Sequence, residues 1–109
     1  MHVIEVMNAE LLDTIAQRAK ELGITDGAIV SLIGAVDAFT VSTMPASDAT
    51  ADVITEHDLP AETHGTGEIT DGPVHIHATM AVEGDRGICG HVHSAQIGTW
   101  FARAYVLPC

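Results

Sequence analysis

Four of the seven histidines in the chain form two H-x-H pairs, His75 with His77 and His91 with His93. In an extended strand, residues two apart point to the same face, so each pair presents two imidazole rings side by side. Neutral imidazole suits zinc, copper, iron and nickel, and three histidines with an open position can activate a bound water. The two pairs therefore predict a metal site, with zinc as the first expectation.

The register of two strands decides whether these pairs meet. The strands are expected at 74–82 and 88–97, joined by a turn at 83–87. Their apolar residues are even-numbered: Val74, Ile76, Ala78, Met80 and Val82 in the first, Ile88 and Val92 in the second. A one-residue slip would turn one set to solvent, so even residues should lie opposite even ones. All four histidines then share the other face, with His77 across from His91 or His93.

A second turn at Asp71-Gly72 extends the histidine face. If it is a two-residue hairpin loop, the register places Glu68 beside His75 and His64 beside Thr79. A carboxylate and a fifth histidine thereby join the cluster. Glu68 is the candidate catalytic residue, either as a general base or as a group that orients a water.

Other polar residues are interpreted structurally. His2 and His57 stand alone and are expected to be surface or hydrogen-bonded residues. Cys89 shares the histidine face by parity but is expected to be a small packed thiol rather than a ligand. Arg103 is expected in a surface salt bridge, and a merely solvated cluster is the alternative for the two H-x-H pairs.

The elements that must position these residues are one helix and a largely antiparallel sheet. A strand at 2–7 precedes a helix that should begin at an Asn8 N-cap and end at Gly23, with Leu11, Leu12, Ile15, Ala19 and Leu22 on its apolar side. Gly34 is expected to be a bend or bulge. The remaining strands are expected at 28–33, 36–44, 52–58, 62–69, 74–82, 88–97 and 99–107. The fold class is therefore α+β, a mostly antiparallel sheet with one main N-terminal amphipathic helix.

Length and composition exclude several classes of protein. At 109 residues the chain should form a single domain, 1–109, and no apolar stretch approaches the ~20 residues that cross a bilayer. No secretory signal precedes the first strand, so a cytoplasmic location is expected, and Cys89 and Cys109 should be reduced. A net charge of −11 opposes direct nucleic-acid binding by this chain alone.

The order of these features resembles the PPC family, a domain that plants and prokaryotes share. The residues that carry the resemblance are the strand entering Gly34-Ala35-Val36, Gly67-Glu68-Ile69 followed by Asp71-Gly72-Pro73, the pair His75-x-His77, and Gly90-His91. The resemblance extends from the first strand to near Pro108. It implies a curved antiparallel sheet assembled as a homotrimer, with the histidines near subunit boundaries.

Carried over by residue, the resemblance makes His75, His77 and His91 the metal-binding candidates. His93 stands where the family commonly has an aliphatic residue, and Cys89 replaces a frequent glycine, so the exact ligand set stays open. The basic Arg-Gly-Arg-Pro segment of the plant proteins, the AT-hook, is absent. A rival resemblance to the cupin barrel rests on His75-x-His77, Glu83 and Gly90, but no second cupin motif follows.

The expected function is therefore a small homotrimeric protein that binds a divalent transition metal through His75, His77, His91 and His93. In one form it is a metal-dependent enzyme acting on a small molecule bound at a subunit boundary. The alternative is a non-catalytic regulatory, DNA-associated or scaffolding module of the same family. A binder of a small anionic ligand is a third possibility.

Overall fold

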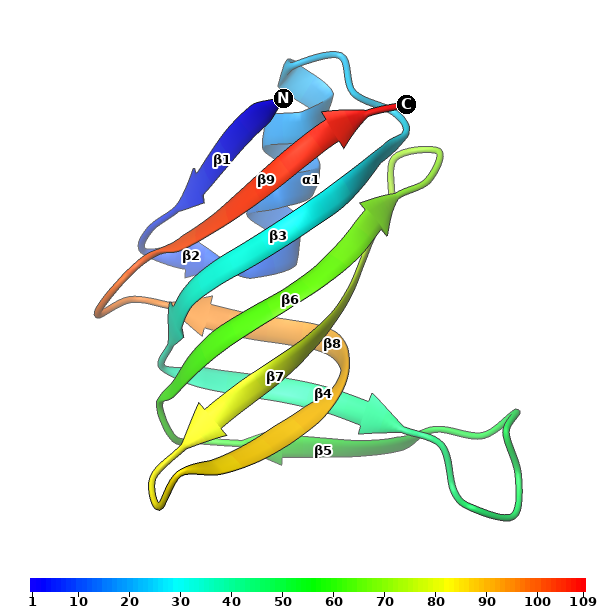
Figure 1. Cartoon of the computed structure of the whole chain (residues 1–109), viewed down its shortest axis with the longest axis vertical. Helices are drawn as coiled ribbons and strands as arrows, with labels where there is room; N and C mark the ends of the chain where they lie inside the picture. Colours follow the sequence, from blue (N-terminus) through cyan, green and yellow to red (C-terminus); the bar gives the residue numbers. More distant parts are fainter.

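Nine strands form one curved, open antiparallel sheet, and one short helix lies against one of its faces (Figure 1). The computed structural model describes all residues from Met1 to Cys109. The elements are β1 (His2–Val6), β2 (Ala9–Glu10), α1 (Leu11–Glu21), β3 (Gly27–Val36), β4 (Ala38–Thr43), β5 (Val53–His57), β6 (Ala61–Ile69), β7 (Val74–Val82), β8 (Arg86–Ile97) and β9 (Ala102–Pro108). The order across the sheet is β1-β9-β3-β6-β7-β8-β4-β5, and the short β2 pairs with β8.

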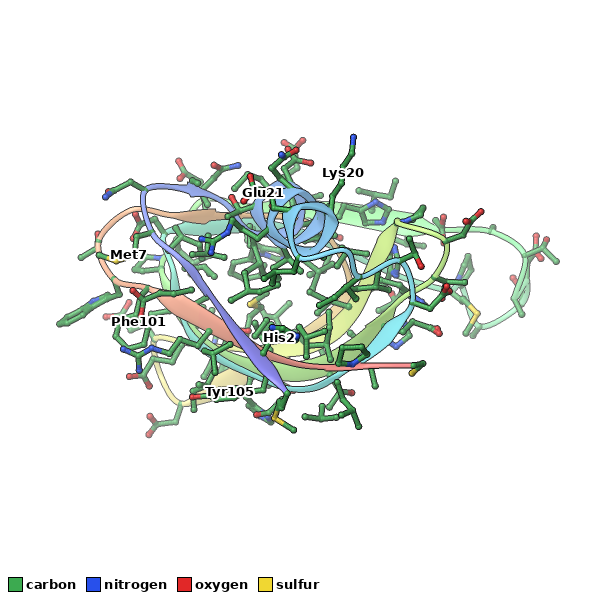
Figure 2. All side chains as sticks on the ribbon, turned by 90° about the horizontal axis from the view of Figure 1, so that it is seen from above. His2, Met7, Lys20, Glu21, Phe101 and Tyr105 are labelled. Atoms are coloured by element: carbon green, nitrogen blue, oxygen red, sulfur yellow. The ribbon has the colours of Figure 1, made fainter.

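The core lies between α1 and the face of the sheet that curves toward it. Figure 2 shows the helix on one side of the sheet, with Lys20 and Glu21 pointing away from it. The 23 buried hydrophobic side chains belong to a single cluster, so this face holds the only large apolar core. The helix contributes Leu11, Ile15 and Ala19 to it.

The helix begins two residues later than expected. Asn8 has a positive φ of 51° and lies before β2, whereas the N-cap is Glu10, whose Oε1 accepts a hydrogen bond from the Asp13 N–H at 2.9 Å. The other carboxylate oxygen of Glu10 accepts from the Ala95 N–H at 2.8 Å. The Asn8 prediction was therefore wrong, because a glutamate shared between the helix and β8 provides the cap.

The end of the helix was predicted correctly at Gly23. Its φ is +74°, and the N–H groups of Gly23 and Ile24 donate to the carbonyls of Lys20 and Ala19. This pair of bonds is the Schellman arrangement, which favours glycine at its left-handed position. Leu22, expected on the apolar side, is instead the C-cap and is 42% exposed.

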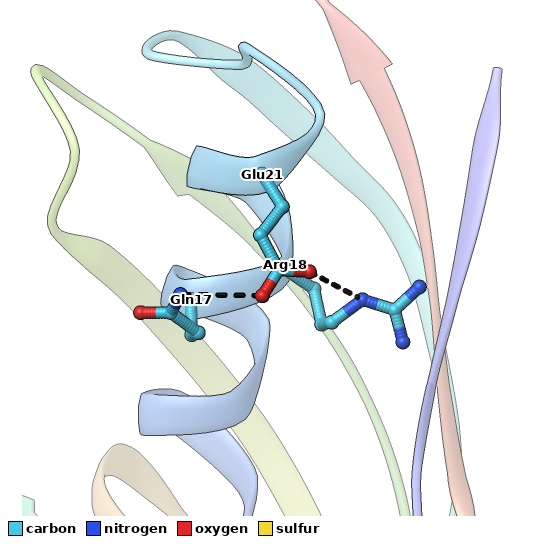
Figure 3. Close-up of polar contacts among 3 residues, drawn as sticks. All are labelled: Gln17, Arg18 and Glu21. Atoms are coloured by element: carbon cyan, nitrogen blue, oxygen red, sulfur yellow. Dashed lines mark hydrogen bonds and ion pairs between the residues drawn. The ribbon is translucent and has the colours of Figure 1, made fainter.

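Solvent-facing side chains of the helix contact one another (Figure 3). Glu21 accepts a hydrogen bond from Gln17 at 3.2 Å and lies 3.4 Å from the Nε of Arg18. Both members of the ion pair are about half exposed, so it adds little stability. With 11 residues, α1 is the only helix, and it is neither long nor apolar enough to span a membrane.

Gly34 is not the bend that the sequence suggested. β3 continues through it to Val36, and the irregularity lies earlier, between Ile29 and Leu32, where the pairing with both neighbours shifts. A Cβ at Gly34 would overlap the carbonyl oxygen of Phe101. The glycine is therefore explained by the close approach of the chain at the start of β9 rather than by a change of direction.

The other strands lie close to their predicted ranges, and β5 is at the edge of the sheet as expected. Two ends differ. β4 starts only at Ala38, and β9 starts at Ala102, which leaves Trp100 outside the strand and 63% exposed. The sequence had placed Trp100 in the alternation with Ala102.

Candidate metal centre

The pairing of β7 with β8 brings two histidines directly opposite each other. His77 pairs with His91, and the pairing continues to Val82 and Arg86 on either side of a three-residue turn. Ile76 and Val92 are completely buried on the core face. The parity prediction is therefore confirmed: burial of the even-numbered residues places the histidines on the face away from the core.

The turn before β7 has the predicted form. Asp71 and Gly72 both have positive φ, 53° and 101°, as a two-residue hairpin turn of type I′ requires. The resulting register pairs Glu68 with His75 and Thr66 with His77. β6 thus places its outward-facing side chains beside the histidines of β7.

Three of the four histidines converge. His75, His77 and His91 can each offer one ring nitrogen, and these three atoms all lie within 4.8 Å of one another. Nε2 of His75 and Nε2 of His77 are 3.0 Å apart, a hydrogen-bonding distance. The ring centroids lie 4.7 to 5.6 Å apart, and His91 is half-buried while the other two rings are exposed.

His93 lies beside this group but is turned toward β4. Its Nε2 is 2.8 Å from Oγ of the buried Ser42, although its ring centroid is only 4.8 Å from that of His91. The cause is a bulge, because Val41 pairs with Val92 and Thr40 with Ser94, which leaves His93 without a partner on β4. His93 as a metal ligand therefore stays a prediction.

Protonation of His91 is disfavoured. Burial lowers the pKa of the imidazole first, and the neighbouring rings of His75, His93 and His77 lower it further. The carboxylate of Asp52 acts in the opposite direction as the smallest of these influences. The nitrogen lone pair of His91 is therefore available to a metal at lower pH than that of an ordinary histidine.

A family model matches nearly the whole chain. Residues 1–107 match the family model of the Plants and Prokaryotes Conserved (PCC) domain. The chain belongs to this family. The match confirms the resemblance drawn from the glycines and the histidine pair, because it covers the helix and all of the sheet except the last residue of β9.

Solved structures similar to this PCC domain share its fold. A metal-containing protein from Archaeoglobus fulgidus superposes with a TM-score of 0.82 at 24% identity, over 98% of this chain and 77% of that one. A PPC protein from Pyrococcus horikoshii gives 0.81 at 16% identity, over 99% and 79%. A protein from Ralstonia eutropha JMP134, named provisionally for DNA binding, gives 0.83 at 18%, over 98% and 76%. No curated protein sequence matches the chain.

Two cavities flank the histidines of this PCC domain. The smaller, about 260 Å³, is lined by Thr66, Gly67, Glu68, His75 and His77. The larger, about 940 Å³, shares Thr66 and His77 and extends past His91. Glu68 is exposed and lines only the smaller cavity, so it lies on one side of the cluster.

The larger cavity includes residues that the sequence analysis did not place at the site. Ser42, Thr43, Met44 and Asp52 come from the end of β4 and the loop that follows it. They reach the histidines only because β4 pairs with β8, and no local motif indicates that pairing. His64 also lines this cavity, as its predicted position opposite Thr79 allows.

Cys89 corrects one expectation. It lies on the histidine face as predicted, but its thiol is exposed and lines the larger cavity rather than being packed. Its Sγ is 3.5 Å from Oγ1 of Thr79, the residue directly opposite. Arg103 meets its prediction, since its Nε lies 2.9 Å from a carboxylate oxygen of Glu5 on the exposed side of β1 and β9.

Proposed function

We propose that this PCC domain binds one divalent transition metal ion, with zinc as the first candidate, through His75, His77 and His91. The observation that supports this most strongly is the convergence of three ring nitrogens within 4.8 Å of one another. Imidazole is a preferred zinc ligand, and three histidines leave a fourth position for water or a ligand. The Archaeoglobus fulgidus relative is itself a metal-containing protein.

The distances fit a site that closes when the ion binds. With Zn–N bonds of about 2.0 to 2.1 Å, two ligands in a tetrahedron lie roughly 3.3 Å apart. His75 and His77 are already at 3.0 Å, and the remaining separations of up to 4.8 Å are larger. His75 and His77 are exposed, so small rotations about their side-chain bonds can bring the nitrogens to bonding distance.

His93 and Glu68 have separate places in this proposal. His93 is a fourth candidate ligand, but it would first have to leave Ser42. Glu68 pairs with His75 and borders the smaller cavity, where its carboxylate could accept a proton from a water or orient that water. A zinc ion bound here would lower the pKa of its water to about 7. The proposed catalytic form of the protein is therefore hydrolytic.

Metal titration of protein purified without a polyhistidine tag tests the proposal. We expect one ion per chain, and His77→Gln should weaken binding by at least about 100-fold, since loss of an outer-sphere partner alone costs about 10- to 100-fold. The matched control is His57→Gln, because His57 stacks on Phe39 away from the cluster. Absence of binding, or equal affinities of the two variants, would reject the metal site.

Assembly as a homotrimer is also part of the proposal. The family resemblance suggested it, and exposed apolar side chains at two separate places support it: Met44, Val53 and Ile54 around the β4–β5 loop, and Val30 and Ile33 on β3. Light scattering coupled to size-exclusion chromatography should give three times the mass of one chain. A monomer at micromolar concentration would contradict this assembly.

A further inference from the structure

The two cavities beside the histidines differ in what they can hold. Small-molecule sites have volumes of roughly 300 to 1,000 Å³, and a water takes about 30 Å³. The cavity beside Glu68, about 260 Å³, falls below that range and has room for roughly eight or nine waters. The larger cavity, about 940 Å³, has room for an organic ligand next to His77 and His91.

The lining of the larger cavity limits the chemistry of that ligand. Its polar side chains are four hydroxyls and one carboxylate, besides three imidazoles: Ser42, Thr43, Thr66, Thr79, Asp52, His64, His77 and His91. The lining includes no lysine, arginine, phenylalanine, tyrosine or tryptophan. Phosphate groups are commonly held by arginine or lysine, and aromatic ligands by apolar walls. The remaining surface of the cavity is largely carbon, so it favours a small aliphatic ligand that carries polar groups and at most one negative charge.

The metal site would provide the attraction for that single charge. His77 and His91 line the cavity at one end, so a divalent ion held by them would face its interior. The chain as a whole carries −11, which disfavours a polyanion. A carboxylate suits this end, because it is a monoanion with oxygen atoms that bind zinc.

The spacing along the strands sets the length of the ligand. Thr79 and Cys89 form the next outward-facing pair beyond His77 and His91, two residues farther along β7 and β8. Two residues of a strand extend roughly 7 Å. The Thr79 hydroxyl lies 3.5 Å from the Cys89 thiol, and a thiol is a weak hydrogen-bond partner, so the hydroxyl can exchange it for a stronger one.

We infer that the larger cavity binds a short aliphatic hydroxy acid, with its carboxylate toward His77 and His91 and its hydroxyl bonded to Thr79. The inference rests on the proposed metal site, which supplies the charge that the carboxylate needs. It assigns Thr79 a role in ligand selection, and it makes the Cys89 thiol part of the wall of the binding site.

Calorimetry with zinc-loaded protein can compare 3-hydroxybutyrate with butyrate, which differ by one hydroxyl. We expect the hydroxy acid to bind about three- to tenfold more tightly, as one additional hydrogen bond allows. Thr79→Val should abolish this preference. Thr55→Val, an identical change on the exposed edge strand β5, should preserve it. Equal affinity for the two acids, or a preference that survives in Thr79→Val, would overturn the inference.

Thiol alkylation gives a second readout with an internal reference. Bound 3-hydroxybutyrate should slow the reaction of iodoacetamide with Cys89 but not with Cys109, which is exposed and outside the cavity. Unchanged rates at both thiols would contradict the placement of the ligand. The zinc content of each sample is measured first. Full zinc occupancy without hydroxy-acid binding rejects only this inference, whereas failure to bind zinc rejects the proposed function as well.

Discussion

At the scale of single residues, the neighbouring imidazoles oppose the protonation of His91. The pKa of His91 is lowered by burial and by its histidine neighbours, so the folded chain binds a proton there less readily than the unfolded chain does. Between the lowered pKa and the ordinary value of about 6.5, the unfolded state therefore carries more protons. Stability from this group is complete above pH ~6.5 and is lost as the pH falls through the folded-state pKa.

Replacing His75, the neighbour with the largest Coulombic effect, should reverse part of the lowering of the His91 pKa. In metal-free protein, His75→Gln should raise the pKa of His91 toward its ordinary value, because His75 is the first of the three rings that lower it. The pKa is read from the pH dependence of the His91 ring signals in NMR spectra. His57→Gln is the control and should leave it unchanged. A pKa of His91 that stays the same or falls in His75→Gln would contradict the cluster geometry.

At the scale of elements, two glycines let β7 approach β6 closely. Gly65 and Gly67 pair with Ala78 and Ile76, and a Cβ on either glycine would overlap a carbonyl oxygen of β7. At Gly67 that oxygen belongs to His75. The position of His75, a proposed metal ligand, therefore depends on the absence of a side chain at Gly67 in the neighbouring strand.

Gly67→Ala should therefore destabilise the protein by about 1 to 3 kcal/mol, the usual cost of an added methyl group in a tightly packed place. It should also weaken metal binding, because the His75 backbone must move. Gly87→Ala is the matched control in β8, since its Cβ would meet only Thr79 Cγ2 at an ordinary 3.5 Å. Urea unfolding of both variants measures their free energies of unfolding. Equal stability of Gly67→Ala and Gly87→Ala would contradict the close approach of β7 to β6 at Gly67.

The hairpins could be predicted from the sequence because their determinants are local. Asp71-Gly72 fixes one turn, and the alternation around Ile76 and Val92 fixes the register of the next pair of strands. Those two facts placed His77 opposite His91 or His93, of which the structure has His91, and Glu68 opposite His75. The local part of the candidate site was therefore accessible without coordinates.

The features that could not be predicted depend on distant partners. The bulge that turns His93 toward Ser42 arises from pairing with β4, and the Glu10 cap depends on the Ala95 N–H, 85 residues away. A signal for the bulge was present, because the buried residues of β8 change from even-numbered Val92 to odd-numbered Ala95. Local propensity alone favoured Asn8 as the cap.

At the scale of the whole molecule, the net charge favours one of two functions that the family comparison leaves open, metal binding and DNA binding. A relative from Ralstonia eutropha is named provisionally for DNA binding, whereas this chain has fifteen acidic and four basic residues. Binding to duplex DNA draws on contacts between lysine or arginine and phosphates. An acidic chain gains little from such contacts and is repelled at long range.

We therefore expect no saturable binding of this chain to a short DNA duplex at a salt concentration of about 0.15 M. Fluorescence anisotropy of a labelled duplex measures this, with and without added zinc. Added zinc should not change this result, because one divalent ion per chain offsets only a small part of the −11 charge. A dissociation constant of roughly 1 µM or lower would instead favour the DNA-associated function.

The metal site is tested most directly by diffraction from crystals of tag-free protein grown with zinc, with data collected on both sides of the zinc absorption edge. We expect one anomalous peak per chain, about 2.0 to 2.1 Å from a ring nitrogen of each of His75, His77 and His91. A fully ordered histidine cluster with no anomalous peak, or a peak bound elsewhere on the chain, would contradict the proposed function.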